Sequence, residues 1–183
     1  MPTIYDNIEK RLLPELIQTT KSSYRADFCV GYFNLRGWKE LGKCVEDWAG
    51  GENHCVRLLV GMQKMPSELI ADIYKAGEPD PEPDNPTKIR IRRRLAEEFR
   101  EQLVIGTPTN QDEIALRKLL AQLKAKQVVV HLFVRYPLHA KLYLLIREDH
   151  ITPNIAYMGS SNLTLAGLQN QGELNIDVLD QDA

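Results

Sequence analysis

The chain has 183 residues, 43% of them hydrophobic and 26% charged, and a formal net charge of −2. This length and composition are typical of a single globular domain with a proper core, and they exclude a disordered chain. The longest apolar runs are far shorter than the roughly 20 residues that cross a bilayer, and the N-terminus lacks the basic and apolar regions of a signal peptide. We therefore expect one cytoplasmic domain over residues 1–183, with no membrane partner.

The cysteine pattern does not indicate a fold held by disulfide bonds or zinc. The chain has three cysteines, Cys29, Cys44 and Cys55, without C-x-x-C spacing. An odd number at these spacings favours buried reduced thiols over a disulfide framework or a zinc site.

Hydrophobic periodicity predicts alternating helices and strands. In chain order, the predicted helices are 7–20, 38–50, 66–76, 87–103, 111–126 and 163–168. The predicted strands are 26–33, 55–62, 128–136, 139–146, 155–159 and 174–179. Four prolines in ten residues mark 77–86 as a linker. This order predicts an α/β fold with a mixed β-sheet flanked by helices on both faces, and a helical insertion around 66–126.

Positive charge is concentrated in the middle of the chain. Residues 86–126 contain 10 Lys and Arg against 5 Asp and Glu, a balance of +5, whereas 139–183 contain 2 against 6, a balance of −4. The focus is KIRIRRR, with the cations Lys88, Arg90, Arg92, Arg93 and Arg94. Such a cluster can contact nucleic-acid phosphates. It can equally be a solvated helix face whose following glutamates, Glu97, Glu98 and Glu101, offset the charge.

The stretch RYPLHAKLYLLI, 135–146, places a histidine and a lysine in a nearly apolar run. Alternate side chains of a strand share a face, so we expect His139, Lys141 and Tyr143 to lie on one side. A buried lysine is costly unless an anion compensates it. Because a bare H-x-K tripeptide arises by chance in many chains, the downstream sequence has to decide its meaning.

A second polar stretch follows the predicted strand that ends at Gly159. Ser160, Ser161 and Asn162 lead from this strand into a short helix. Small hydroxyl and amide donors at a helix N-terminus suit a phosphate. Ordinary capping of the helix by Asn162 is the alternative explanation of the same residues.

Taken together, the two stretches resemble the signature of the phospholipase D superfamily, H-x-K-x-x-x-x-D followed by G-S-x-N. The matching residues are His139, Lys141, Gly159, Ser160 and Asn162. A further acidic residue follows G-S-x-N in this family, and Glu173 stands in the matching place. Two features depart from the pattern: Ile146 replaces the family's Asp, and the segment from Lys141 to Gly159 is longer than in the short form of the motif.

Within the superfamily, two stretches resemble a particular group of proteins. GSSNLTLAGLQNQGELN, 159–175, and VGYFNLRGW, 30–38, are similar to the phospholipase D-like domain at the N-terminus of bacterial superfamily II helicases and restriction-type endonucleases. The resemblance implies that 1–183 is the N-terminal part of a longer helicase-containing protein.

The resemblance also implies a chemistry without a metal or other cofactor. Lys141 and Asn162, assisted by Ser160, would hold the nonbridging oxygens of a phosphodiester. His139 would attack phosphorus to give a phosphohistidine, and a second histidine would protonate the leaving oxygen. Glu173 would orient a histidine by accepting a hydrogen bond from its other ring nitrogen.

The number of motifs bears on assembly and substrate. The chain has one H-x-K and no internal repeat, and family members of this kind pair two subunits about a two-fold axis to build one site. We therefore expect a homodimer in which the two His139 strands converge. The basic cluster favours a nucleic acid as substrate, and the resemblance to helicase-linked and restriction-type domains implies DNA. The alternatives are a DNA-binding or dimerising module with weak or no catalysis, suggested by Ile146, and a phosphodiesterase acting on lipid or another small substrate.

Overall fold

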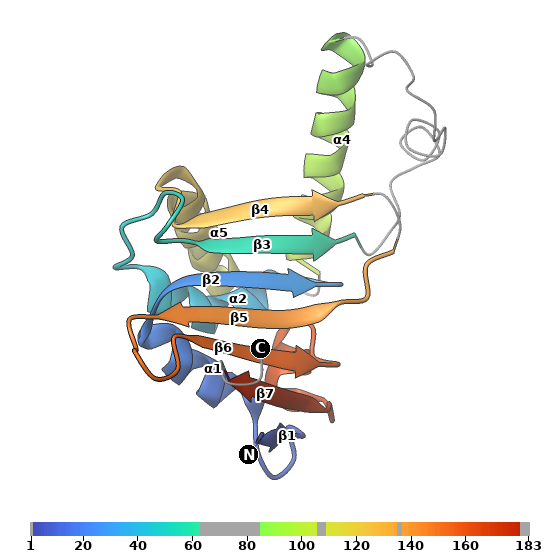
Figure 1. Cartoon of the computed structure of the whole chain (residues 1–183). Helices are drawn as coiled ribbons and strands as arrows, with labels where there is room; N and C mark the ends of the chain where they lie inside the picture. The colour runs from blue at the N-terminus through green and yellow to red at the C-terminus, as the bar shows by residue number, and fades with distance from the viewer. Residues whose placement is uncertain (1, 63–84, 106–108, 135–136, 180–183) are drawn as a thin grey trace, which may run out of the picture.

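A computed structural model describes residues 2–62, 85–105, 109–134 and 137–179. Seven strands form one sheet in the order β1-β7-β6-β5-β2-β3-β4 (Figure 1). The strands are β1 Ile4–Tyr5, β2 Ser23–Val30, β3 Val56–Gly61, β4 Val128–Phe133, β5 Lys141–Arg147, β6 Asn154–Gly159 and β7 Asn175–Leu179. The sheet is mixed, as predicted.

The strand directions bring several chain ends to one side of the sheet. β2, β3 and β4 run parallel to one another, whereas β5 is antiparallel to β2, and β6, β7 and β1 continue the antiparallel pairing. β2, β3 and β6 therefore end where β5 and β7 begin, at the right-hand side of Figure 1. We call this side the carboxyl end of β2.

The described helices lie behind the sheet in Figure 1, except that much of α4 extends above it. They are α1 Leu12–Lys21, α2 Leu35–Leu41, the 3₁₀ turn η1 Gly42–Val45, α4 Asn85–Leu103, α5 Asn110–Lys124 and the π-helical turn η2 Ala166–Asn170. Helix α5 connects the parallel strands β3 and β4, and its residues Ala115 and Leu119 are buried in the core. The Trp38 indole of α2 donates a hydrogen bond to the Gln122 amide oxygen of α5, 3.0 Å away. Helix α5 was predicted as part of a helical insertion. It also packs in the core, between the parallel strands β3 and β4.

Within the described residues, the sheet carries its core on one face. Along β2 and β3, the side chains of Phe28, Val30 and Leu58 are buried, whereas those of alternate residues are half-buried or exposed. This alternation is typical of a sheet covered on one side. On the opposite face Leu59 is 36% exposed and Met158 is 48% exposed. Helices were predicted to cover both faces of the sheet. Within the described ranges they cover one face.

Helix α1 begins five residues later than the periodicity of 7–20 predicts. Asn7 adopts a positive φ of 61°, and the Asp6 carboxylate accepts hydrogen bonds from the backbone N–H groups of Ile8, Glu9 and Lys10. These side-chain bonds hold the backbone in a turn, because Asp and Asn compete with helix formation in this way.

Two other predictions concern length and location. The helix predicted at 66–76 and most of the linker at 77–86 lie outside the described residues. Within the described ranges, no helix combines the length and apolar character needed to cross a membrane.

Candidate functional site

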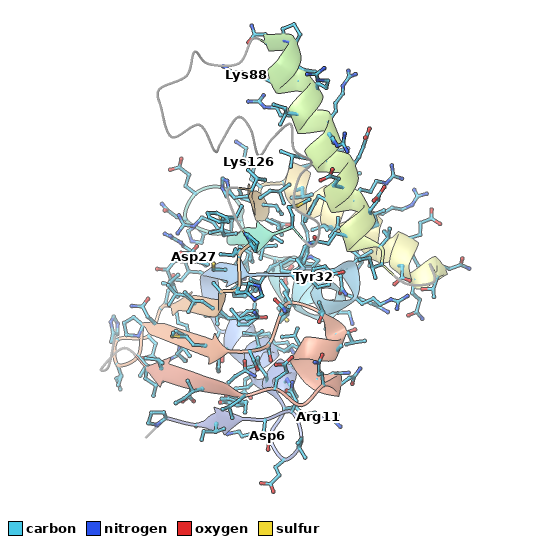
Figure 2. The ribbon with its side chains drawn as sticks, turned by 90° about the vertical axis from the view of Figure 1, so that its right-hand side faces the viewer. Asp6, Arg11, Asp27, Tyr32, Lys88 and Lys126 are labelled. Atoms are coloured by element: carbon cyan, nitrogen blue, oxygen red, sulfur yellow. The ribbon has the colours of Figure 1, made fainter. Side chains whose placement is uncertain are left out.

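The register of the sheet brings the predicted catalytic residues together. Lys141, the first residue of β5, pairs with Val30, the last of β2, and Gly159, the last of β6, pairs with Asn175, the first of β7. His139, Ser160, Asn162 and Glu173 each lie within a few residues of these ends. Segments from three parts of the chain therefore meet at the carboxyl end of β2, which faces the viewer in Figure 2.

His139 lies in an extended loop just before β5, where it is exposed. The prediction placed it inside the strand, but the strand pairing begins at Lys141. The loop crosses the ends of β2 and β3 at close range: a Cβ added to Gly31 would lie 2.4 Å from the Leu138 carbonyl oxygen, and one added to Gly61 would lie 3.1 Å from Leu138 Cβ. Glycines are required at both positions for the loop to hold His139 where it is.

Lys141 shares the helix-covered face of β5 with Tyr143, as predicted, and is half-buried. Its Nζ ammonium donates a hydrogen bond to the backbone carbonyl of His139, 2.8 Å away. The Lys141 ammonium thus lies beside the backbone of His139, at the first residue of β5.

A buried polar network holds the turn that follows β6. The backbone N–H of Ser161 donates to the Asn175 amide oxygen at 3.2 Å, and the Asn175 amide nitrogen donates to the Ser161 hydroxyl at 2.8 Å. The Tyr143 hydroxyl donates to the Ser161 carbonyl at 2.8 Å. Ser161 is 0% exposed, Tyr143 is 1% exposed and Asn175 is 2% exposed. The three residues fix the backbone on which Ser160 and Asn162 stand, a role the motif alone did not reveal.

Ser160 is exposed at the surface of this turn. Its hydroxyl oxygen accepts a hydrogen bond from the Leu174 backbone N–H at 3.0 Å, and its own N–H donates to the Leu174 carbonyl at 3.0 Å. These bonds tie the turn after β6 to the segment that leads into β7.

Asn162 does not cap the following helix. Its side-chain oxygen accepts a hydrogen bond from the Tyr32 backbone N–H at 2.9 Å, whereas the Gly167 backbone N–H donates to the Thr164 hydroxyl at 3.0 Å. Thr164, and not Asn162, thus accepts a backbone N–H of this helical turn through its side chain. Among the described residues, the Asn162 amide nitrogen has no hydrogen-bond acceptor, so both of its hydrogens are available to a ligand.

Glu173 lies just before β7 and is half-buried. The pKa of the Tyr143 phenol is raised well above its ordinary value, first by complete burial and then by the negative charge of Glu173. Within the described residues no carboxylate is hydrogen-bonded to the His139 ring, so the predicted Glu173–histidine contact is not present in the single subunit.

Ile146, which replaces the family's Asp, is remote from this cluster. It lies five residues beyond Lys141 and pairs with Asn154 at the other end of β5. Five residues of strand correspond to about 16 Å. The substitution therefore leaves the residues at the carboxyl end of β2 unchanged.

The basic cluster lies on the N-terminal half of α4. Arg90, Arg92, Arg93 and Arg94 are exposed and Lys88 is half-buried. Of the glutamates expected to offset them, Glu98 forms an ion pair with Arg94 at 3.1 Å. Both views show this half of the helix extending beyond the sheet, with Lys88 near its tip (Figures 1 and 2).

The remaining histidines lie away from the cluster. His54 contacts the Tyr24 ring at a centroid distance of 5.5 Å, and His150 is exposed in the turn after β5. His131 is exposed on β4. Its position pairs with Leu59 on the uncovered face, so His131 does not belong to the core.

Comparison with known proteins finds similarity only at the level of structure. No protein-family model and no curated protein sequence matches the chain. Nuc from Salmonella typhimurium, a phospholipase D family member, is similar with a TM-score of 0.47 and 10% identity, over 98% of this chain and 82% of that one. NucT from Helicobacter pylori is similar with a TM-score of 0.47 and 10% identity, over 98% and 86%.

Polyphosphate kinase from Porphyromonas gingivalis is also similar, with a TM-score of 0.48 and 9% identity. This chain is covered completely in that comparison, but it spans only 24% of the kinase. Similarity at this level concerns the general arrangement of helices and strands, and the chemistry of this chain has to be sought in its own side chains.

Proposed function

We propose that this chain is a metal-independent phosphodiesterase that cleaves DNA at the carboxyl end of β2. The observation that carries the proposal is the convergence there of His139, Lys141, Ser160, Asn162 and Glu173 from three segments of the chain. A nucleophile, a cation, amide and hydroxyl donors and a carboxylate are the groups that phosphodiester hydrolysis needs in the absence of a metal.

Each group has a task in the proposed reaction. The Lys141 ammonium and the Asn162 amide hydrogens bind the nonbridging oxygens, with Ser160 beside them, and stabilise the charge that develops on them. An unprotonated ring nitrogen of His139 attacks phosphorus, the bond to the leaving oxygen breaks, and a second histidine gives that oxygen its proton. Water then attacks the phosphohistidine, gives a proton to the second histidine and releases the phosphate monoester.

The second histidine is proposed to come from a second copy of the chain. His139 is exposed at the end of the sheet, where a two-fold axis could bring two such residues to one phosphate. A homodimer with one shared site also makes a kinetic prediction. If His139→Ala protein exchanges with wild type at a constant total concentration, activity should fall as the square of the wild-type fraction, because a mixed dimer holds one histidine only. A linear fall, or an active monomer in sedimentation, would contradict the shared site.

DNA is the proposed substrate because the chain carries a cationic helix beside the site. The exposed arginines of α4 can contact phosphates without reading base sequence. We further propose that the domain works in the cytoplasm, with a helicase region in the same protein, as the sequence resemblance implies.

The test is cleavage of supercoiled plasmid and labelled single-stranded DNA in excess EDTA. Wild type should cut both, and His139→Ala should lose at least about 1,000-fold in rate, as removal of a nucleophile does. His150→Ala, which removes an exposed histidine at the other end of β5, is the matched control and should cut like wild type.

One observation favours a second candidate, a DNA-binding or dimerising module of a helicase with weak or no catalysis. Among the described residues, no hydrogen bond orients the His139 ring, and a histidine without an orienting partner is a poor nucleophile. DNA bound with equal affinity by wild type and His139→Ala, with no EDTA-resistant cleavage by either, would establish this module instead.

A further inference from the structure

The charges of α4 run in the opposite order to the one that stabilises a helix. A helix dipole favours acidic residues at the N-terminus and basic residues at the C-terminus. In α4 the first turn has no acidic residue, the N-terminal half carries the arginines from Arg90 to Arg94, and Glu97, Glu98 and Glu101 follow them. Arg100 in the last turn follows the favourable order, and the cations of the N-terminal half do not.

Two other helices of the same chain follow the ordinary rule. Helix α5 has Asp112 and Glu113 in its first turn and Lys124 in its last, with Thr109 and Asp112 forming a capping box. Helix α1 has Glu15 in its first turn and Lys21 in its last. Unlike α1 and α5, α4 thus gathers its cations in its N-terminal half, and binding of a polyanion would offset their mutual repulsion.

Little within the described part of the chain neutralises these cations. Arg94 pairs with Glu98 at the surface, a kind of contact that contributes little. Arg90, Arg92 and Arg93 are exposed and have no carboxylate partner among the described residues. Arg90, Arg93 and Arg94 are spaced i, i+3 and i+4, so they share one face of the helix.

The base of α4 is built into the proposed catalytic site. The Phe99 ring stacks on Phe33 with centroids 6.0 Å apart, and the Gln102 amide nitrogen donates to the carbonyls of Phe33 at 3.4 Å and Gly61 at 3.3 Å. The neighbour of Phe33 is Tyr32, whose N–H binds the Asn162 side chain. The helix is therefore anchored at the carboxyl end of β2 and extends from it as an arm (Figure 2).

The length of the arm can be compared with the spacing of DNA phosphates. From Gln102 to Arg94 is eight residues and to Arg90 twelve, or about 12 and 18 Å along the helix axis. One strand of B-DNA advances about 3.4 Å per phosphate. The arginine face therefore lies about four or five nucleotides from a phosphate bound near Asn162, if the strand follows the arm.

We infer that the Arg90, Arg93 and Arg94 face of α4 is a second phosphate-binding surface, which makes the site selective for polynucleotides that extend at least about five nucleotides beyond the cleaved bond. This inference rests on the proposed function. It distinguishes a strand long enough to reach both surfaces from a dinucleotide or other small diester, which reaches the catalytic residues alone.

The test compares the triple variant Arg90→Gln, Arg93→Gln, Arg94→Gln with wild type. The matched control is Arg117→Gln, Lys118→Gln, Lys124→Gln, which removes three exposed cations from α5. The substrates are bis(p-nitrophenyl) phosphate and DNA oligonucleotides of 4, 8, 16 and 30 residues, each assayed in EDTA for kcat and KM.

For wild type and the control, kcat/KM should rise at least about tenfold between the 4-mer and the 16-mer, because the longer strand gains three phosphate contacts. The α4 variant should lose that rise through a higher KM, and should hydrolyse bis(p-nitrophenyl) phosphate at the wild-type rate. An equal length dependence in the α4 variant and wild type would overturn the inference.

Binding separates failure of the inference from failure of the proposed function. If wild type cleaves nothing, the proposed catalysis fails, and fluorescence anisotropy with the same oligonucleotides still tests the arm. The α4 variant should then bind the 16-mer at least about tenfold more weakly than the control does, with a salt dependence lower by about two to three in slope. Affinities and salt slopes equal to those of the control would overturn the second surface.

Discussion

The side-chain oxygen of Asn162 accepts a hydrogen bond from the backbone N–H of Tyr32, 2.9 Å away, although 130 positions separate the two residues. A backbone N–H can only donate, so the amide group of Asn162 has one possible orientation, with its nitrogen turned away from Tyr32. This bond joins the turn after β6 to the loop after β2, and it aims a donor at the proposed phosphate site.

Replacing Asn162 with Asp should separate structure from binding. A carboxylate can still accept from Tyr32, so we expect the free energy of unfolding to stay within about 1 kcal/mol of wild type. The outward donor becomes a negative charge, which repels phosphate, and kcat/KM in EDTA should fall at least about 100-fold. Denaturant unfolding and oligonucleotide cleavage measure the two effects. If the Asn162→Asp variant cleaves DNA within about threefold of the wild-type rate, Asn162 does not belong to the site.

Gly31→Ala should displace the loop that carries His139. The new Cβ would lie 2.4 Å from the Leu138 carbonyl, so the loop has to shift, and overpacking of this kind costs about 1–3 kcal/mol. We expect a loss of cleavage larger than the loss of stability explains. Gly172→Ala is the control, because its nearest neighbour is Ile8 Cδ1 at 4.0 Å. Equal activity of the two variants would contradict a positioning role for Gly31.

Asn175→Ala should loosen the turn that bears Ser160 and Asn162. It removes the acceptor for the Ser161 N–H and the donor to the Ser161 hydroxyl, and an unsatisfied buried group costs about 1–3 kcal/mol. Thermal unfolding should show this loss. If the network positions the site, kcat should fall more than KM rises, even at temperatures where the variant is fully folded. An unchanged kcat at those temperatures would show that Asn175 contributes to stability alone.

Asp27→Asn tests the acid dependence of stability. Burial alone would raise the pKa of Asp27, but hydrogen bonds from Arg57 and Arg25 outweigh it and lower that pKa. The ordinary value is about 3.9, so the stabilisation is fully present above about pH 5 and is lost as the pH falls through the lower folded value. We expect the variant to be about 1 kcal/mol less stable at pH 7.

The same difference should shrink as the pH is lowered. Urea unfolding of both proteins at pH 7, 5 and 3 measures it, with Glu148→Gln as an exposed carboxylate control. A difference that grows toward pH 3 would show that the Arg57–Asp27–Arg25 cluster does not stabilise the fold.

Much of the fold follows from local sequence pattern. Strands β2 to β7 were predicted to within a few residues because each is an apolar run bounded by glycine, proline or polar residues. The helical stretch at 7–20 was predicted too long, since periodicity does not register the hydrogen bonds by which Asp6 holds the backbone. The one-sided cover of the sheet also depended on which strands become neighbours, and that is a long-range property.

The reactive residues of the site could be predicted from the sequence, but the residues that position them could not. His139, Lys141 and Asn162 stand in recognisable spacing, and the sheet register brings them to one end. Tyr143 was noticed only as a neighbour on the same strand face. Its bond to the Ser161 carbonyl joins segments 18 positions apart, and no local pattern encodes such a pairing.

The position of β2 also affects how the chain folds as it is synthesised. This central strand pairs on one side with β5, with Val30 opposite Lys141, so its partner leaves the ribosome more than 100 residues later. Long-range pairing of this kind makes folding slow and exposes strand edges while it is incomplete. Until β5 emerges, Phe28, Val30 and Leu58 on β2 and β3 lack part of the core that buries them, and we expect the chain to be most exposed to aggregation during this interval.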